Sequence, residues 1–117
     1  GVAFDAILAA NDAMALGAID ALEAAGKPLP PIVGVNAVPD AIAAIMAGKL
    51  LATASFDAMK MACLAAEAAV RHLQGESVPR EISLPVDIID RANCAAWDLP
   101  FEQRALPQWD VVVGTRR

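Results

Sequence analysis

Two asparagines, a serine and a phenylalanine in this chain stand directly behind short apolar runs. The runs 6–10, 31–35 and 51–54 are followed by Asn11, by Asn36, and by Ser55 with Phe56. The segments between the runs are long enough for helices, and connections of that kind join parallel strands. Because parallel strands end at one edge of a sheet, where open α/β folds bind ligands, we expect these residues to line a single crevice. The sequence therefore predicts a ligand-binding site at this edge of the sheet.

Each of these residues also has a structural interpretation that the sequence leaves open. Asn11 and Asn36 both have the side chain of a good helix N-cap, and a cap at this position can still face the crevice. Ser55 fits a turn in which its hydroxyl bonds the backbone. Phe56 fits an apolar core as well as a platform for a ligand. Asp12 is predicted to cap the first helix or to interact with its dipole.

Catalytic and metal-binding groups are not predicted. His72 is the single histidine, and near the end of a predicted helix it is expected to be solvated or to cap the helix. Neither a Gly-x-Ser-x-Gly motif nor a Cys–His arrangement is present, so we predict that the chain is not an enzyme. No residues have the spacing of metal ligands or of a phosphate loop, so no cofactor is expected. Cys63 and Cys94 are predicted to be free thiols.

The composition describes one acidic domain with a large apolar content. Of its 117 residues, 57% are hydrophobic, whereas about 45–50% is usual for soluble domains. The net charge of −5 argues against nucleic acid or an anionic membrane as a partner, because both need clustered Lys and Arg. Acidic residues interrupt the apolar runs before they reach the roughly 18–20 residues of a membrane span. Part of the apolar surface is therefore expected to face a partner or a further part of a larger chain.

Helical patterns and turn signals predict an α/β fold with a parallel sheet and flanking helices. The predicted helices cover 12–25, a short segment that begins near Pro39 and ends at Gly48, and 57–74. A fourth strand is predicted over 82–89, where Pro85 confines the first half to an edge or a bend.

The last part of the chain, residues 94–117, has no helical period and contains Trp97, Phe101 and Trp109. We predict an extended arm whose aromatic side chains anchor it to a surface. A frayed terminus is the alternative, and the run 111–113 offers a further edge strand.

An ordered series of short motifs in this chain resembles a known family. The series runs through residues 9–18, 25–27, 32–36, 39–40 and 47–53, and continues through 75–79, 85–86, 89–90 and 93. Its longest pieces include Asn-Asp-Ala-Met-Ala at 11–15 and Ala-Gly-Lys-Leu-Leu-Ala-Thr at 47–53. Over residues 4–93 it is similar to the C-terminal third of the type I periplasmic binding proteins of sugar transporters, the ribose- and galactose-binding group.

The resemblance implies a three-layer α/β fold that is part of a two-lobe protein with a hinge. Its parts would be a βαβαβ segment of the C-terminal lobe (1–56), a helix and loop that pack on an N-terminal lobe (57–85), a returning strand (86–93) and the arm (94–117). The resemblance implies that an N-terminal lobe is absent from this sequence, which indicates a fragment. The lack of an initial Met also indicates a fragment or a processed product. Because the helix at 57–74 would lack its partner surface, we expect the isolated chain to dimerise or to exchange segments.

The function implied by the resemblance is the capture of a small polar ligand, a sugar or polyol, for import by an ABC transporter. The implied partner is the membrane permease, and the implied location is the periplasm. A signal peptide is not recognisable in residues 1–5, which have neither a basic nor a long apolar region. Two alternatives share the fold: the effector-binding domain of a lac-repressor-type regulator, and the input domain of a periplasmic sensor. The stretch 47–53 favours the transporter group.

The family's ligand contacts carry over to this chain residue by residue. Asn11 matches the asparagine of the family's Asn-Asp-x-Met-Ala motif. Asn36 stands where the family usually has aspartate, and Phe56 stands where it often has glutamine. An asparagine forms weaker bonds to hydroxyl groups than an aspartate does, while a phenylalanine ring can stack on the apolar face of a sugar. Val35 and Ser55, the neighbours of these two residues, complete the predicted contacts.

Overall fold

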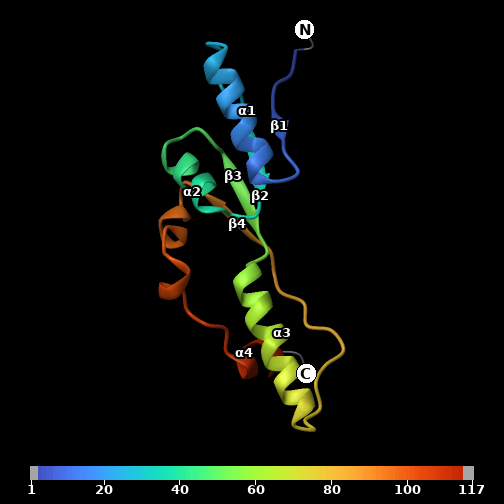
Figure 1. The fold of residues 1–117 in the computed structure, drawn as a ribbon. Helices are drawn as coiled ribbons and strands as arrows, with labels where there is room; N and C mark the ends of the chain where they lie inside the picture. Colours follow the sequence, from blue (N-terminus) through green and yellow to red (C-terminus); the bar gives the residue numbers. More distant parts are fainter. Residues whose placement is uncertain (1–2, 115–117) are drawn as a thin grey trace. The chain divides into compact units, whose positions relative to one another are not determined.

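The structure of this protein is a computed structural model that describes residues 3–114 (Figure 1). Its chain divides into two compact units, each with its own architecture. The first unit runs up to Ser55 and resumes at Asp87–Leu99, while the second comprises Phe56–Val86 and the residues from Pro100 onward. Among the described helices, none is both long enough and apolar enough to cross a membrane.

The first unit is a four-stranded sheet with two α-helices and a short 3-10 helix (Figure 1). In chain order its elements are β1 (Ile7–Leu8), α1 (Asp12–Ala24), β2 (Ile32–Val35), α2 (Pro39–Met46), β3 (Ala52–Ser55), β4 (Asp87–Asp90) and η1 (Cys94–Trp97). The strands lie in the order β1-β2-β3-β4; the first three are parallel, and β4 is antiparallel to β3. The predicted α/β class is therefore confirmed, with a sheet that β4 makes mixed.

The fourth strand is shorter than the sequence predicts. The sequence predicts a strand over 82–89, whereas β4 covers Asp87–Asp90. Asp87 pairs with Ser55, the last residue of β3. The residues before Asp87 therefore have no residue of β3 opposite them with which to pair. Pro85 also has no N–H to donate to a strand ladder.

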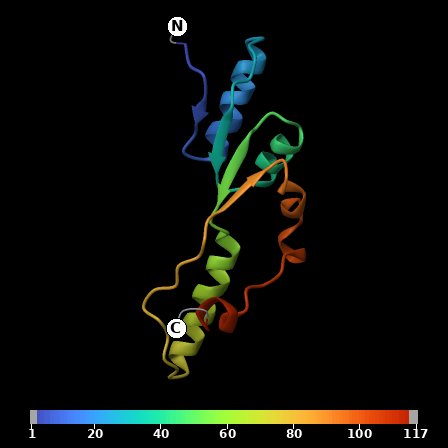
Figure 2. The ribbon, with the colours of Figure 1, turned by 180° about the vertical axis from the view of Figure 1, so that it is seen from behind.

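Both α-helices of the first unit cover the same face of its sheet. Buried side chains on this face and on its helices include Ala15, Ile19, Ile32, Ile42, Ile45, Thr53 and Ile89. On the opposite face Leu8 is 82% and Ile88 60% exposed. The connections from β1 to β2 and from β2 to β3 are both crossovers between neighbouring parallel strands, and right-handed crossovers in this order place both helices on one side of the sheet. The helix α1 runs along β2 in both views (Figures 1 and 2). Of the three implied layers, this unit contains the sheet and one layer of helices.

The second unit contains α3 (Ala58–Leu73), η2 (Phe101–Gln103) and α4 (Trp109–Gly114). Asp57 caps α3: its carboxylate accepts a hydrogen bond of 3.0 Å from the Lys60 backbone N–H. Leu64 is the buried residue of α3, whereas Val70 is 53% and Leu73 85% exposed. Much of the apolar surface of this helix is thus open to solvent.

The described part of the C-terminal arm contains short helical segments, η1, η2 and α4, joined by non-helical residues, and is not extended throughout. Val111, Val112 and Val113 lie in α4 and not in an edge strand, and the Val112 N–H donates to the Gln108 carbonyl. β-Branched residues favour strands, but the burial of Trp109 on the second unit overrides that local preference. The predicted aromatic anchoring is found for Trp109, and for Trp97, which packs against the core of the first unit. Residues 115–117 of the predicted arm lie outside the described residues.

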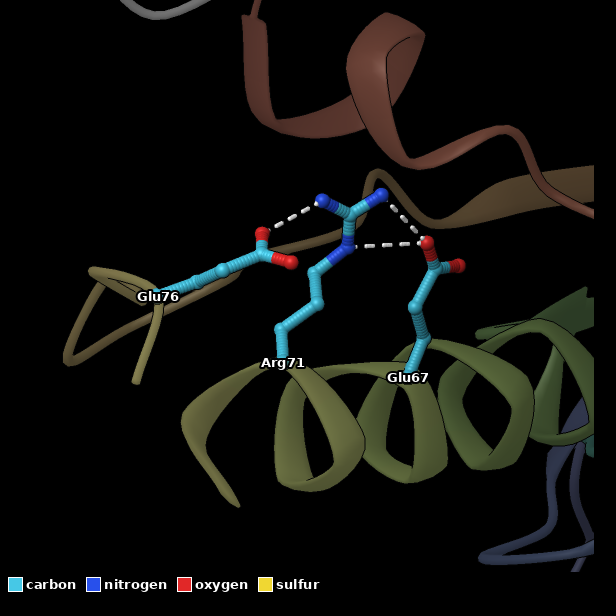
Figure 3. A network of polar contacts seen from close by, with 3 residues as sticks. All are labelled: Glu67, Arg71 and Glu76. Atoms are coloured by element: carbon cyan, nitrogen blue, oxygen red, sulfur yellow. Dashed lines mark hydrogen bonds and ion pairs between the residues drawn. The ribbon is translucent and has the colours of Figure 1, made fainter. Parts of the chain in front are cut away.

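One arginine ties α3, the turn after it and α4 together. Arg71 donates from Nε and Nη2 to Glu67 Oε1 at 3.0 and 2.9 Å, and from Nη1 to Glu76 Oε2 at 2.8 Å (Figure 3). Its guanidinium also lies 4.9 Å from the ring centroid of Trp109. The hydrogen bonds to Glu67 and then to Glu76 raise the pKa of Arg71 above its ordinary value. The Arg71 side chain thus contacts α3, the turn after it and α4 within the second unit.

Candidate functional site

The carboxyl edge of the parallel strands gathers most of the predicted site residues. Asn11 follows β1, Val35 ends β2, Asn36 follows it, and Ser55 ends β3. The strands are in register, and the Asn36 N–H donates to the Ala54 carbonyl of β3 at 2.8 Å. The predicted convergence of these segments on one edge is therefore present in the first unit.

Phe56 is the exception among the predicted site residues. It follows Ser55 in the chain but is the first residue of the second unit. Its side chain is 40% exposed. Its role as a ligand platform or as hinge core stays a prediction.

Asn11 is the N-cap of α1, as one of its two interpretations predicts. Its Oδ1 accepts a hydrogen bond of 2.9 Å from the Met14 backbone N–H. The side chain is half-buried, and its Nδ2 group has no hydrogen-bond partner among the described residues. The capping bond thus occupies the Oδ1 acceptor of the Asn11 amide, while the two N–H donors of Nδ2 stay free for a ligand.

Asn36 does not cap a helix. The N-cap of α2 is Val38, which makes no side-chain capping bond. Asn36 is exposed and has a φ of 115°, in the region that Asn enters more readily than most residues. Its side-chain amide makes no hydrogen bond to the described part of the chain, so both its acceptor and its donors are open to a ligand.

Ser55 and Val35 are less accessible to a ligand than Asn36 is. Ser55 is 2% exposed and lies within β3, which favours a structural role over direct contact. Val35 is half-buried at the end of β2. Direct contact of Ser55 and Val35 with a ligand stays a prediction.

Asp12 forms the centre of the site's polar network, which the sequence did not reveal. Its side chain is fully buried; Oδ1 accepts a hydrogen bond of 2.7 Å from the Thr53 hydroxyl, and Oδ2 accepts one of 3.0 Å from the Val38 N–H. Thr53 Oγ1 in turn accepts a hydrogen bond of 3.2 Å from the Ala37 N–H. Asp12 is in the first turn of α1, but its carboxylate links the segments after β1 and β2 to β3 instead of capping the helix.

Gly34 makes room for this network. A Cβ on Gly34 would overlap the Asp12 carboxylate and would lie 3.4 Å from the Ala15 Cβ. The glycine lies in the middle of β2, where a side chain is normally favoured. A glycine inside a predicted strand indicates that another part of the chain approaches the strand closely. At Gly34 that part is Asp12.

Asp87 is a further polar residue at the same edge. It pairs with Ser55, because the antiparallel β4 begins where β3 ends. Its carboxylate is exposed and has no partner among residues 3–114. The sequence could not place it here, because strand direction is not encoded in the apolar pattern of β4.

This edge presents side-chain amides and a carboxylate that can bind polar groups. Within the described residues, no three His, Cys, Asp or Glu side chains are grouped as metal ligands would be. Cys63 and Cys94 are both free thiols, as predicted. Amides and a carboxylate at a strand edge supply directed donors and acceptors for hydroxyl groups.

The amino-acid sequence of this chain is similar to a family model and to several curated proteins. Residues 2–77 match the family model of the periplasmic binding protein domain. A Rhizobium meliloti protein assigned to rhizopine binding is 41% identical over 97 residues, which are 81% of this chain and 31% of that protein. The ribose import binding protein of Escherichia coli is 40% identical over 83 residues, 71% of this chain and 27% of its own length. The chain thus spans about a third or less of the curated relatives it matches.

The fold of this chain is also similar to part of several solved structures. An ABC transporter solute binding protein from Bacillus halodurans with bound myo-inositol has a TM-score of 0.78 and 37% identity, covering 84% of this chain and 34% of that one. The Caulobacter myo-inositol binding protein, bound to myo-inositol, has a TM-score of 0.72 and 32% identity, covering 79% and 32%. In both, about two-thirds of the solved chain lies outside the matched part.

Proposed function

This chain belongs to the periplasmic binding protein domain family, and from that premise we propose that it supplies one wall of a site for a small polyhydroxylated ligand, a sugar or cyclitol. The exposed, unpartnered amide of Asn36 at the carboxyl edge of the sheet carries the proposal. One carbonyl and one NH2 group match two neighbouring hydroxyls, of which one donates and the other accepts. Asn11 adds the donors of its Nδ2 group. The myo-inositol held by two similar structures is a ligand of this class.

The wider proposal concerns a longer protein of the kind that the relatives represent. In it, segment 1–56 forms part of the C-terminal lobe, 57–85 packs on an N-terminal lobe, and 86–93 returns to the first. Ligand binding closes the lobes on each other, and the closed form delivers the ligand to the permease of an ABC transporter in the periplasm. The role is binding, not catalysis, and with a net charge of −5 it involves no nucleic acid.

Nuclear magnetic resonance titration of the 117-residue chain with myo-inositol and with D-ribose tests the ligand site. We expect the side-chain amide signals of Asn11 and Asn36 to shift in a saturable manner. Replacing Asn36 with Ala removes the unpartnered amide, so the affinity is expected to fall by about 1–3 kcal/mol, or roughly 5- to 150-fold.

Asn93 provides an internal control in the same spectra. Its side chain is committed to the first unit, since Oδ1 accepts from the Asp90 N–H and Nδ2 donates to the Ile88 carbonyl. It follows the end of β4 that lies away from the carboxyl edge of the parallel strands, so its signals should not move. Equal shifts at Asn93 and Asn36, or an unchanged affinity after Asn36→Ala, would contradict the assigned site.

Self-association of this chain is a separate expectation. Leu8 and Ile88 expose one sheet face of the first unit, and Val70 and Leu73 expose α3 in the second. We propose that two copies cover part of this surface by dimerising or by exchanging a segment. Small-angle scattering with light scattering should give a mass near twice 12.1 kDa at high micromolar concentration. A monomer that binds little hydrophobic dye at that concentration would contradict it.

A further inference from the structure

The turn that follows β2 has a backbone conformation that most residues avoid. Asn36 has a φ of 115° and Ala37 a φ of 54°. Single left-handed residues are usually Gly or Asn, and alanine is disfavoured there because its Cβ crowds the following carbonyl. Two such residues in succession need surrounding contacts that hold them.

Those contacts come from two neighbouring elements and engage three consecutive backbone N–H groups. The Asn36 N–H donates to the Ala54 carbonyl at 2.8 Å, within the β2–β3 ladder. The Ala37 N–H donates to Thr53 Oγ1 at 3.2 Å, and the Val38 N–H donates to Asp12 Oδ2 at 3.0 Å.

Asp12 and Thr53 are themselves locked together. Their side chains are 0% and 1% exposed, and the Thr53 hydroxyl donates to Asp12 Oδ1 at 2.7 Å. No side-chain N or O atom that is buried within the described residues is left without a partner. A buried carboxylate with two short, directed bonds is a rigid support, because any displacement leaves a buried donor unsatisfied.

The network uses the backbone donors of this turn but leaves the Asn36 side chain free. We propose that Asp12 and Thr53 are positioning residues, which hold the Asn36 amide in the orientation that binds ligand without touching the ligand themselves. Prior fixation of a contact group lowers the ordering cost of binding, so loss of the support weakens affinity. This inference rests on the proposed function, and it adds that the affinity for ligand depends on Asp12 and Thr53, two buried residues that do not contact the ligand.

Two substitutions of Thr53 separate positioning from general stability. Thr53→Val keeps the shape of the side chain but removes the hydroxyl, and Thr53→Ser keeps the hydroxyl but removes a methyl group. For myo-inositol, we expect the valine variant to bind on the order of tenfold more weakly and the serine variant to bind within about twofold of the parent chain.

Amide hydrogen exchange in the absence of ligand gives an independent measurement. The N–H groups of Ala37 and Val38 should exchange faster in the valine variant and at parental rates in the serine variant, while core amides such as that of Ile19 keep their protection. If the valine variant does not fold, Thr53→Ala replaces it, because alanine also removes the hydroxyl but places no methyl group against the Asp12 carboxylate. Asn36 should then be more mobile, and affinity should again fall.

The outcomes distinguish this inference from the function on which it rests. A folded valine or alanine variant of Thr53 with parental affinity, or with unchanged exchange at residues 37 and 38, overturns the positioning role. A serine variant as weak as the valine variant also overturns it, because packing and not the hydroxyl would then be responsible. If the parent chain binds none of the probes, the proposed function fails and the ligand role of Asp12 and Thr53 fails with it.

Discussion

Gly34→Ala is expected to lower the free energy of unfolding by about 2–4 kcal/mol, although it adds only one methyl group. That methyl would overlap the Asp12 carboxylate and would also approach the Asp12 Cα to 3.2 Å. A side-chain tip can rotate away, but the helix backbone of α1 cannot move without disturbing the core around Ala15. If the carboxylate rotates, the Thr53 hydroxyl and the Val38 N–H lose their acceptor. Urea denaturation followed by tryptophan fluorescence measures the change.

Gly17→Ala is the matched control for this prediction. Gly17 lies inside α1, and a Cβ there would have no atom within 4 Å. Because alanine is a better helix former than glycine, this variant should gain about 0.5–1 kcal/mol of stability. The two glycine-to-alanine changes should thus have opposite signs, and a Gly34→Ala variant as stable as the parent would contradict the close approach.

Local signals in the sequence predict the helices and the strand ends well. Asn11, Pro39 and Asp57 each lie at the start of a helix, and the structure begins its three long helices within one residue of them. These signals succeed because capping side chains and proline geometry act within one turn of the chain. The convergence of Asn11 and Asn36 on one edge follows from the parallel direction of β1 and β2, which the length of the connection between them predicts.

The features that the sequence did not predict depend on contacts between distant segments. Asp12 and Thr53 are 41 positions apart, and nothing local identifies their hydrogen bond. Val111–Val113 has the composition of a strand, yet α4 forms because Trp109 is buried against the second unit. The exposed amide of Asn36 has a related cause, since the backbone bonds of the turn determine its φ and exclude it from capping α2.

Asp12→Ala is expected to cost about 3 kcal/mol of unfolding free energy, which is large for the loss of one carboxylate. Its removal leaves the buried Thr53 hydroxyl and the Val38 N–H without their acceptor, and each unsatisfied group costs about 1–3 kcal/mol. Asp40→Ala is the control: Asp40 occupies the first turn of α2 but is exposed, so only its small dipole interaction, about 0.3–1 kcal/mol, is lost.

The double variant Asp12→Ala with Gly34→Ala tests the cause of both effects. Once the carboxylate is absent, the added methyl on residue 34 meets only the Cα of residue 12 and the Ala15 Cβ, at 3.2 and 3.4 Å. Gly34→Ala should then cost about 1 kcal/mol instead of 2–4, a coupling of about 1–3 kcal/mol between the two sites. Additive costs in urea denaturation would show that the carboxylate is not what keeps residue 34 a glycine. A double-variant cost below the sum of the two single costs would show that the buried Asp12 carboxylate is what excludes a side chain at residue 34.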